Sequence, residues 1–308
     1  MSAAVTKLAY DLVDVFTSRP YAGNQLAVVH GADDLPDESL QAIAREFGFS
    51  ETAFPMRPTH PDAAYRLRIF TPGTELGFAG LPSVGASWVL ATSGQISRGT
   101  VLQECGVGLV QVQVDGTGST LTGAAPHVGP ELAALPLLDA VGLAPSDLDP
   151  SGITAGIAGC GMDFAYLPVT ASALGRATLI PPGTVIEHSP RSVVVVAYDP
   201  EDRMARVRKF GLERSDEDAA TGAAALGLGV YLTDRKVLPA YGLTDLAVVQ
   251  GVEMGRPSLL DVRVRAVDGA AEMVSVRGGV TPIATGQIRV PPVIEESVNR
   301  HVPVRGSR

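Results

Sequence analysis

The fold is decided by the stretch Gly80-Leu81-Pro82-Ser83-Val84-Gly85-Ala86-Ser87-Trp88-Val89-Leu90. A related stretch follows later in the chain: Gly222-Ala223-Ala224-Ala225-Leu226-Gly227-Leu228-Gly229-Val230-Tyr231-Leu232. In each, a glycine opens the stretch, another glycine follows five positions on, and small and apolar residues fill the rest. Each therefore predicts a tight turn followed by an apolar helix. Because this unit occurs twice, the chain is predicted to be duplicated.

The residues before the two stretches support this duplication. Each stretch follows an Arg-x-Phe strand end, Arg68-Ile69-Phe70 in one half and Arg208-Lys209-Phe210 in the other. The remaining patterns in each half favour strands. We therefore expect an α+β fold with two similar domains, each a curved, mostly antiparallel sheet or barrel around one central helix. The expected division is 1–120 and 121–284, with 285–300 as a candidate for a segment that returns to the first domain and 291–308 as a loose tail.

Local patterns add several elements. Leu40, Ile43, Ala44 and Phe47 share one face of a helix predicted over about 37–47, and Gly48 would end it. A second helix is expected over 131–141, although Pro136 disfavours its first part. Residues 273–276 and 287–290 are read as two separate strands.

Composition excludes several functions. The 308 residues carry a net charge of −9, which argues against nucleic acid as the main partner because phosphate binding needs a basic face. No run approaches the roughly 20 apolar residues of a membrane span. The N-terminal residues lack a basic segment followed by an apolar run, so no signal peptide is predicted. We expect a soluble cytoplasmic protein.

Four motifs can be set aside. Gly159-Cys160-Gly161 begins like a dinucleotide-binding fingerprint but lacks its third glycine. Leu81-Pro82-Ser83-Val84-Gly85 misses the first glycine of a serine-hydrolase elbow. The five histidines have no metal-ligand spacing, so no metal is expected. The two cysteines, Cys105 and Cys160, read as buried small residues.

The two predicted helix starts form a candidate anion site. A helix N-terminus carries unpaired backbone N–H groups and a partial positive charge, so it can hold a carboxylate without lysine or arginine. If the halves pack with pseudo-symmetry, both starts face one cleft between domains. The alternative is that the glycines serve packing alone.

Two acidic residues are candidates for this predicted cleft. Glu51 is a single acid in Phe49-Ser50-Glu51-Thr52-Ala53-Phe54, where burial would raise its pKa into the range of a general acid or base. The alternative is an outward-facing acid on a sheet edge. Asp218 precedes Gly222 by four residues and could instead be an ordinary helix-cap or first-turn acid.

Short motifs occur in a fixed order along about residues 8–290. They are Asp14-Val15-Phe16-Thr17, Arg19-Pro20, Ala22-Gly23-Asn24, Leu26-Ala27-Val28-Val29, Ser50-Glu51-Thr52-Ala53-Phe54, Arg68-Ile69-Phe70-Thr71-Pro72, Glu75-Leu76, Phe78-Ala79-Gly80, Glu217-Asp218, Ala220-Thr221-Gly222, Gln250-Gly251 and Met254-Gly255-Arg256-Pro257-Ser258. In this order, the motifs resemble those of the phenazine-biosynthesis PhzF-like family. The resemblance implies the diaminopimelate-epimerase-like fold, a site between the domains, cofactor-independent proton transfer and a homodimer.

The resemblance also assigns roles by position. Glu51 matches the family's catalytic glutamate, and Asp218 matches its site aspartate. Expected substrate-binding residues lie beside them: Asn24, Ser50, Gly80, Leu81, Pro82, Thr221, Gly222 and Ala223.

Two of these positions depart from the family. It often has histidine where this chain has Leu81, and serine where it has Ala223. The departures imply a less polar substrate or weakened activity. They are also symmetry mates in the repeat.

These residues lead to one main hypothesis and two alternatives. The main hypothesis is an isomerase that shifts a proton, and with it a double bond, in a small anionic unsaturated carboxylic or amino acid of specialised metabolism, with Glu51 as general acid and base. One alternative is a binding or regulatory relative that keeps the cleft but not turnover. The other is a cyclase or eliminating enzyme that uses the same base. A two-thiol racemase is disfavoured because neither cysteine lies in the site loops.

Overall fold

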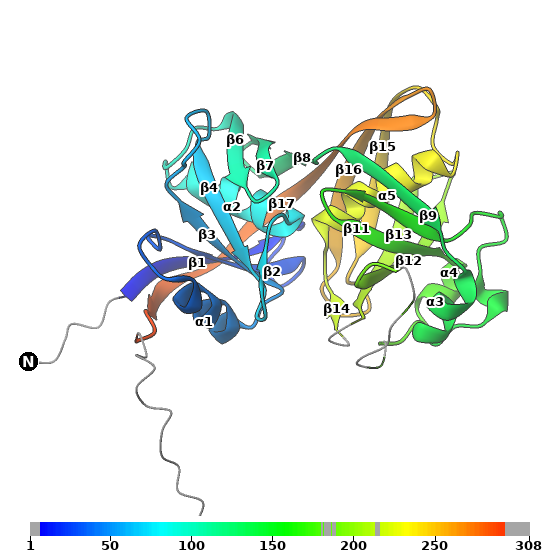
Figure 1. Ribbon diagram of the computed structural model, residues 1–308, viewed down its shortest axis with the longest axis horizontal. Helices are drawn as coiled ribbons and strands as arrows, with labels where there is room; N and C mark the ends of the chain where they lie inside the picture. The colour runs from blue at the N-terminus through cyan, green and yellow to red at the C-terminus, as the bar shows by residue number, and fades with distance from the viewer. Residues whose placement is uncertain (1–6, 180, 182–185, 187–188, 213–215, 293–308) are drawn as a thin grey trace, which may run out of the picture.

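A computed structural model of the chain describes residues 7–179, 181, 186, 189–212 and 216–292. Two lobes lie side by side, each with a helix enclosed by strands (Figure 1). The enclosed helices are α2 (Gly80–Thr92) and α5 (Gly222–Asp234). The predicted α+β fold with one central helix in each half is therefore confirmed.

The composition of α2 and α5 explains their central positions. Both are apolar on every side, and nearly all their residues are buried. A helix without a polar face is stable only where protein surrounds it. Small residues let the strands approach: a Cβ added at Gly85 would lie 2.4 Å from Leu26 Cδ2, and one at Gly227 would lie 2.4 Å from Tyr166 Oη.

The first half is a closed barrel around α2. Its strands are β1 (Lys7–Val15), β2 (Asn24–Val29), β3 (Glu51–Met56), β4 (Tyr65–Phe70), β6 (Gly99–Cys105), β7 (Gly108–Val114) and β8 (Gly118–Thr122). They pair in that order, and β17 joins β8 back to β1. The helix α1 (Asp37–Phe47) packs outside the barrel and ends at Gly48 in the left-handed conformation, as predicted.

The second half wraps a similar sheet around α5, in which β9 pairs with β10 and with no other strand in the described part of the chain. Its strands are β9 (Pro126–Glu131), β10 (Gly156–Cys160), β11 (Asp163–Pro168), β12 (Ser192–Asp199), β13 (Met204–Gly211), β15 (Gly242–Gln250) and β16 (Ser258–Val267). Short strands β5 (Glu75–Leu76) and β14 (Glu217–Asp218) precede the central helices in the two halves. The outer elements α3 (Ala134–Ala140), a 3-10 turn (Pro145–Asp147) and α4 (Ala171–Leu174) cover the second sheet.

The long strand β17 (Ala270–Arg289) runs from one lobe to the other (Figure 1). It pairs with β16 over 270–277, with β8 over 275–279 and with β1 over 280–289. The expectation of two separate strands at 273–276 and 287–290 is therefore wrong. The residues between those two segments include Gly278, Gly279 and Pro282. A Cβ at Gly278 would meet the Phe16 ring at 2.3 Å, and the pairing with β1 shifts register beside Pro282.

The other sequence predictions differ from the structure in detail. The chain changes halves between β8 and β9 and returns along β17, so the expected divisions at 120 and 284 fall inside strands. The helix expected over 131–141 begins at Ala134, because Pro136 fits only the first turn, where no N–H is needed. The expected tail at 291–308 lies outside the described residues from 293 onward. In the described ranges, no helix is long and apolar enough to cross a membrane.

Candidate active site

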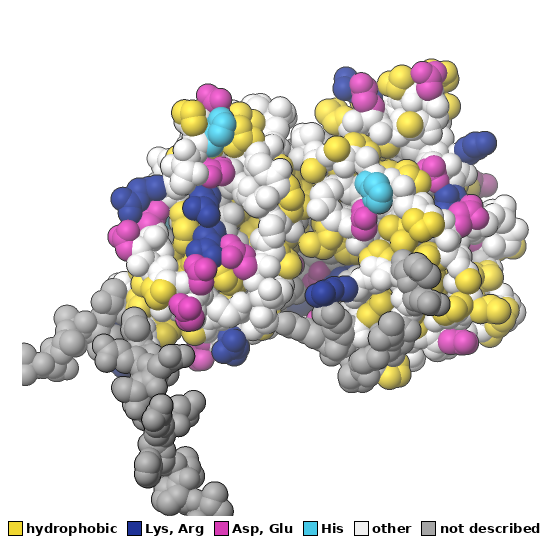
Figure 2. Space-filling view, in the orientation of Figure 1, with side chains coloured by type: hydrophobic (Ala, Val, Ile, Leu, Met, Phe, Trp, Pro, Cys, Tyr) yellow, Lys and Arg dark blue, Asp and Glu magenta, His cyan; other side chains and the backbone are white. Residues whose placement is uncertain are grey.

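A cleft of about 440 Å³ opens between the halves where α2 and α5 begin. Figure 2 shows the surface hollowed between the two lobes, with basic and acidic side chains at and within the hollow. The first half contributes Ser50, Glu51, Gly80 and Leu81 to its lining, and the second contributes Lys209, Asp218, Thr221, Gly222 and Ala223. The cleft therefore unites both helix starts with both candidate acids.

A larger groove, of about 620 Å³, lies on the outer face of β15, β16 and β17. Its charged residues include Arg263, which pairs with Asp245 at 2.6 Å, and Arg277, which pairs with Asp115 at 2.8 Å. These arginines are already paired, and no central helix begins in the groove. Despite its smaller volume, the inter-lobe cleft is the better candidate site because chemically distinct groups converge there.

The first residues of the two central helices, Gly80 and Gly222, are in direct contact. A Cβ added at Gly80 would lie 2.7 Å from Gly222 Cα, and one at Gly222 would lie 2.9 Å from Gly80 Cα. Packing therefore requires a glycine at both positions, and the glycines by themselves do not indicate a ligand. The case for anion binding rests on the capping positions instead: Ala79 and Thr221 make no side-chain cap bond, so the first-turn N–H groups beside the cleft have no side-chain cap.

Glu51 is the first residue of β3 and lines the cleft. Its Oε2 atom is buried and has no hydrogen-bond partner among the described residues. Burial, followed by the negative charge of Asp218, raises the pKa of Glu51 to about 8, although Lys209 acts in the opposite direction. The alternative of an outward-facing edge acid is therefore wrong. A carboxyl group with this pKa can release or accept a proton near neutral pH.

Asp218 is buried in β14 and held by three side-chain donors. Asn24 Nδ2 and Ser50 Oγ donate to its Oδ1 at 2.7 and 2.8 Å, and Thr221 Oγ1 donates to its Oδ2 at 2.6 Å. The helix-cap alternative is wrong, because Thr221 occupies the N-cap position of α5. A carboxylate can accept about four hydrogen bonds, so Asp218 retains capacity for a ligand donor.

Asn24 acts behind the cleft rather than in its lining. Besides Asp218, its amide donates to Ala220 O at 2.9 Å, so it links the first half to the segment before α5. Pro82 is also outside the lining and buried within α2. The other expected binding residues, Ser50, Gly80, Leu81, Thr221, Gly222 and Ala223, all line the cleft.

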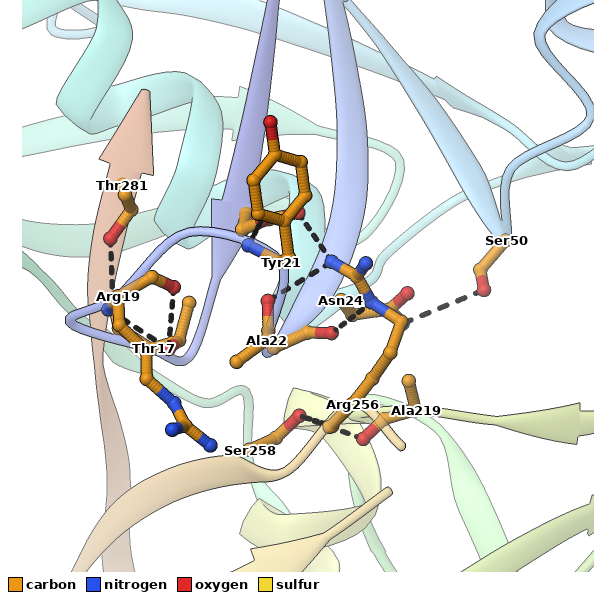
Figure 3. Close-up of polar contacts among 12 residues, drawn as sticks. Thr17, Arg19, Tyr21, Ala22, Asn24, Ser50, Ala219, Arg256, Ser258 and Thr281 are labelled. Atoms are coloured by element: carbon orange, nitrogen blue, oxygen red, sulfur yellow. Dashed lines mark hydrogen bonds and ion pairs between the residues drawn. The ribbon is translucent and has the colours of Figure 1, made fainter. Parts of the chain in front are cut away.

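Arg256 from the second half fixes the loop that leads into Asn24 at the start of β2 (Figure 3). Its Nε donates to Gly23 O at 2.8 Å, and its Nη2 donates to Ala22 O at 3.0 Å and to Asp14 Oδ1 at 2.5 Å. Asp14 Oδ2 in turn accepts from Tyr21 N at 2.7 Å. The motifs around residues 14–24 and 254–258, which are far apart in sequence, therefore form one clamp behind Asp218.

Sequence reasoning missed several residues of the lining. Met162 and Phe164 supply apolar surface, Ser192 lies at the start of β12, and Lys209 brings a cation. Lys209 carried a signal, because it is the central residue of the second Arg-x-Phe unit, where the first unit has Ile69. Phe164 and Ser192 come from strands, and Met162 from the turn between β10 and β11, whose place beside the cleft depends on the duplicated sheet order.

The thiols lie outside this site. Cys105 and Cys160 are buried, as predicted, and neither lines the cleft. Burial raises the pKa of both, that of Cys160 to about 12, which disfavours the reactive thiolate. Within the described residues, no group of three or more His, Cys, Asp or Glu side chains could hold a metal ion.

Comparison with known proteins agrees with this geometry. The family model described as phenazine biosynthesis-like protein matches residues 13–286. The chain belongs to this PhzF-like family. An uncharacterised isomerase of Mesorhizobium japonicum is 32% identical to the PhzF-like chain, covering 91% of it and 98% of the relative. The trans-2,3-dihydro-3-hydroxyanthranilate isomerase of Pseudomonas aeruginosa is 32% identical, covering 90% and 98%.

A solved structure supports the same assignment of the fold. The PhzF-family phenazine biosynthesis protein of Bacillus anthracis superposes with a TM-score of 0.79 at 24% identity, covering 92% of this chain and 99% of that one. The fold is thus that of the diaminopimelate-epimerase-like proteins, as expected. The relatives named above identify the PhzF-like chain as an isomerase.

Proposed function

We propose that this PhzF-like protein moves a proton, and with it a double bond, within a small unsaturated carboxylic or amino acid, without a cofactor. The observation that carries the proposal is Glu51, whose buried Oε2 atom has no partner among the described residues in the cleft shared with two uncapped helix starts. Its pKa of about 8 lets the same group take up and return a proton.

The proposed steps conserve all atoms of the substrate. The substrate carboxylate binds at the N–H groups near Gly80 and Gly222, where the helix dipoles favour negative charge. The carboxylate of Glu51 takes a proton from a carbon beside the double bond, and the electron pair spreads toward the bound carboxylate. Glu51 then returns the proton to another carbon. The helix starts stabilise the negative charge that develops between the two transfers.

Asp218 is assigned the orientation of the substrate. Its three protein donors hold it in place, and its remaining acceptor capacity suits an amine or hydroxyl of the ligand. The name of the Pseudomonas aeruginosa relative specifies a partly reduced, amino- and hydroxy-substituted benzoate, which fits this class of substrate. Leu81 and Ala223 offer no side-chain hydrogen bond, so we infer that the part of the substrate facing these two residues is less polar.

The test is hydrogen exchange at carbon. Candidate acids, beginning with trans-glutaconate and the unsaturated amino acid vinylglycine, are incubated with the enzyme in D₂O and followed by NMR. The wild type should place deuterium at carbon, with a rate that rises toward about pH 8 as Glu51 ionises. Glu51→Gln should lower that rate by about a thousandfold, within the range of general acid–base catalysis. Glu38→Gln, on the exposed surface of α1, is the matched control. Undiminished exchange in Glu51→Gln would refute the role of Glu51.

A binding or regulatory role is the second candidate, and the apolar residues at 81 and 223 favour it. A thermal shift by the same acids without exchange at carbon would support that role, and product structure would separate isomerisation from cyclisation or elimination. A homodimer, a cytoplasmic location and a place in specialised metabolism remain predictions.

A further inference from the structure

Lys209 stands out among the residues of the cleft. It lies near the end of β13, in register with Asp218 of β14, and is half-buried in the cleft lining. Side chains alternate along a strand, so Lys209 shares the face of Val207, which belongs to the central core, and not that of Phe210, which packs in the outer cluster. The lysine therefore lies on the inner face of the second sheet, where this sheet lines the cleft together with the start of α5.

Within the described residues, the ammonium group of Lys209 stands without a bonding partner. It makes no hydrogen bond or ion pair with any residue in the described part of the chain, and its recorded electrostatic effect is to lower the pKa of Glu51. The neighbouring carboxylates already have other partners. Asp218 accepts hydrogen bonds from three side chains. Glu217 accepts two hydrogen bonds from the guanidinium of Arg208, at 2.8 and 2.7 Å. Asp216 also lines the cleft but is exposed. A half-buried ammonium group without a partner is a favourable site for an incoming anion.

The fold itself does not require a cation at this position. The equivalent residue of the first half is Ile69, which pairs with Leu76 as Lys209 pairs with Asp218. Ile69 is fully buried, so the same strand pair is built with an apolar side chain there. Lys209 is thus a feature of the site and not of the scaffold.

We propose that Lys209 binds a second anionic group of the substrate, so that the substrate carries two negative charges, one at the helix starts and one at Lys209. This inference rests on the proposed function, which assigns the first carboxylate to Gly80 and Gly222. It names the substrate class as small unsaturated dianions, of which dicarboxylates are the simplest. The apolar Leu81 and Ala223 and the cationic Lys209 then have one explanation. The backbone N–H groups still bind one carboxylate, and Lys209 on β13 supplies the side-chain contact that Leu81 and Ala223 cannot make.

Matched acids that differ by one carboxylate test the inference. The pairs are fumarate with crotonate, and trans-glutaconate with trans-2-pentenoate, and the dissociation constant of each is measured by calorimetry with the full chain. In at least one pair, the wild type should bind the diacid about tenfold or more tightly than the monoacid, as expected for a charge-assisted bond. Lys209→Met should abolish that preference and leave monoacid affinity within about twofold, whereas Lys209→Arg should retain it.

Lys7→Met, at the exposed start of β1 and outside the cleft, is the control and should bind as the wild type does. No preference for either diacid in the wild type would overturn the inference, and so would a preference that survives Lys209→Met. Exchange in D₂O is measured separately on trans-glutaconate and trans-2-pentenoate. Lys209-dependent diacid binding without exchange would refute the proposed isomerisation alone. Exchange on the monoacid without any diacid preference would refute the role of Lys209 alone.

Discussion

In the first half, the guanidinium of Arg68 makes two bonds of 2.7 Å to the carboxylate of Glu75. In the second half, Arg208 makes the same paired contact with Glu217, at 2.8 and 2.7 Å. Each arginine also lies over the phenylalanine two residues further on, at 5.1 and 4.9 Å from the ring centre. These contacts join each sheet to the short strand before its central helix. The two halves therefore share the arginine–glutamate pair that positions the helix start.

The neighbouring positions have not stayed alike. The registers make Leu76 the counterpart of Asp218, and Ser192 the counterpart of Glu51. Lys209 likewise stands where the first half has Ile69. Each half therefore contributes to the cleft a polar group that the other lacks. The comparison indicates that the duplicated scaffold places two equivalent helix starts at the cleft. The ionisable side chains beside them differ between the halves.

Making the halves alike at one site position should have the largest effect. Asp218→Leu gives the second half the residue of Leu76, and it leaves the buried donors on Asn24, Ser50 and Thr221 without their acceptor. We expect a loss of about 3 kcal/mol in unfolding free energy, measured in urea, together with loss of exchange at carbon. Leu76→Met, the control in the other half, should cost less than about 1.5 kcal/mol. A stability for Asp218→Leu equal to that of the control would contradict this account of the network.

The dependence of the unfolding free energy on pH should reveal the contribution of Glu51. Its pKa is raised from 4.5 to about 8 by folding, so the unfolded chain releases this proton first. The stability contributed by the protonated group is complete below about pH 4.5 and disappears as the pH rises through about 8. Between about pH 5 and about pH 7, the wild type should therefore lose about 2 kcal/mol relative to Glu51→Gln. Parallel stability curves for the two proteins would show that Glu51 is not buried as described.

Arg256 offers a smaller effect and a sharper distinction between the halves. The turn between β15 and β16 is long and carries this arginine, whereas the equivalent turn between β6 and β7 holds only Gly106 and Val107. Arg256→Lys keeps the charge but loses the forked contacts to the loop before Asn24. We expect kcat to fall about tenfold with little change in KM, because Asp218 is then less well oriented.

The control for Arg256 is Arg265→Lys, since Arg265 makes an exposed pair with Glu272. That variant should keep wild-type kinetics. If Arg256→Lys lowered thermal stability but left kcat unchanged, the clamp would be structural only and would not position the site.

The fold was largely predictable because its main signals are local. The apolar composition of α2 and α5 on all sides predicts that they are enclosed by strands. The apolar face of α1 and Gly48 after it predict where that helix lies and ends. The strand β17 was not recognised as one element, since its glycines and proline are accommodated by contacts with Phe16 and β1 that no local pattern contains.

The site was predictable only in part. Glu51 and Asp218 could be found from their positions near the repeated turns and from the family resemblance. The partners of Asp218 could not, because Asn24 reaches it across 194 positions of the sequence. The place of Lys209 required knowing which face of β13 lines the cleft. Such facts depend on register and on packing between halves, which a single sequence does not contain.

The shared strand β17 has a consequence for how this molecule unfolds. Its hydrogen bonds to β16 lie in one barrel and those to β1 lie in the other, with β8 joined at the crossing. Residues 275–277 pair with β16 on one side and with β8 on the other, so opening either half along β17 exposes one edge of a segment that the other half also uses. Although the molecule has two lobes, it should therefore unfold as one cooperative unit, and the slowest amides to exchange with solvent should be those of β17 at the crossing.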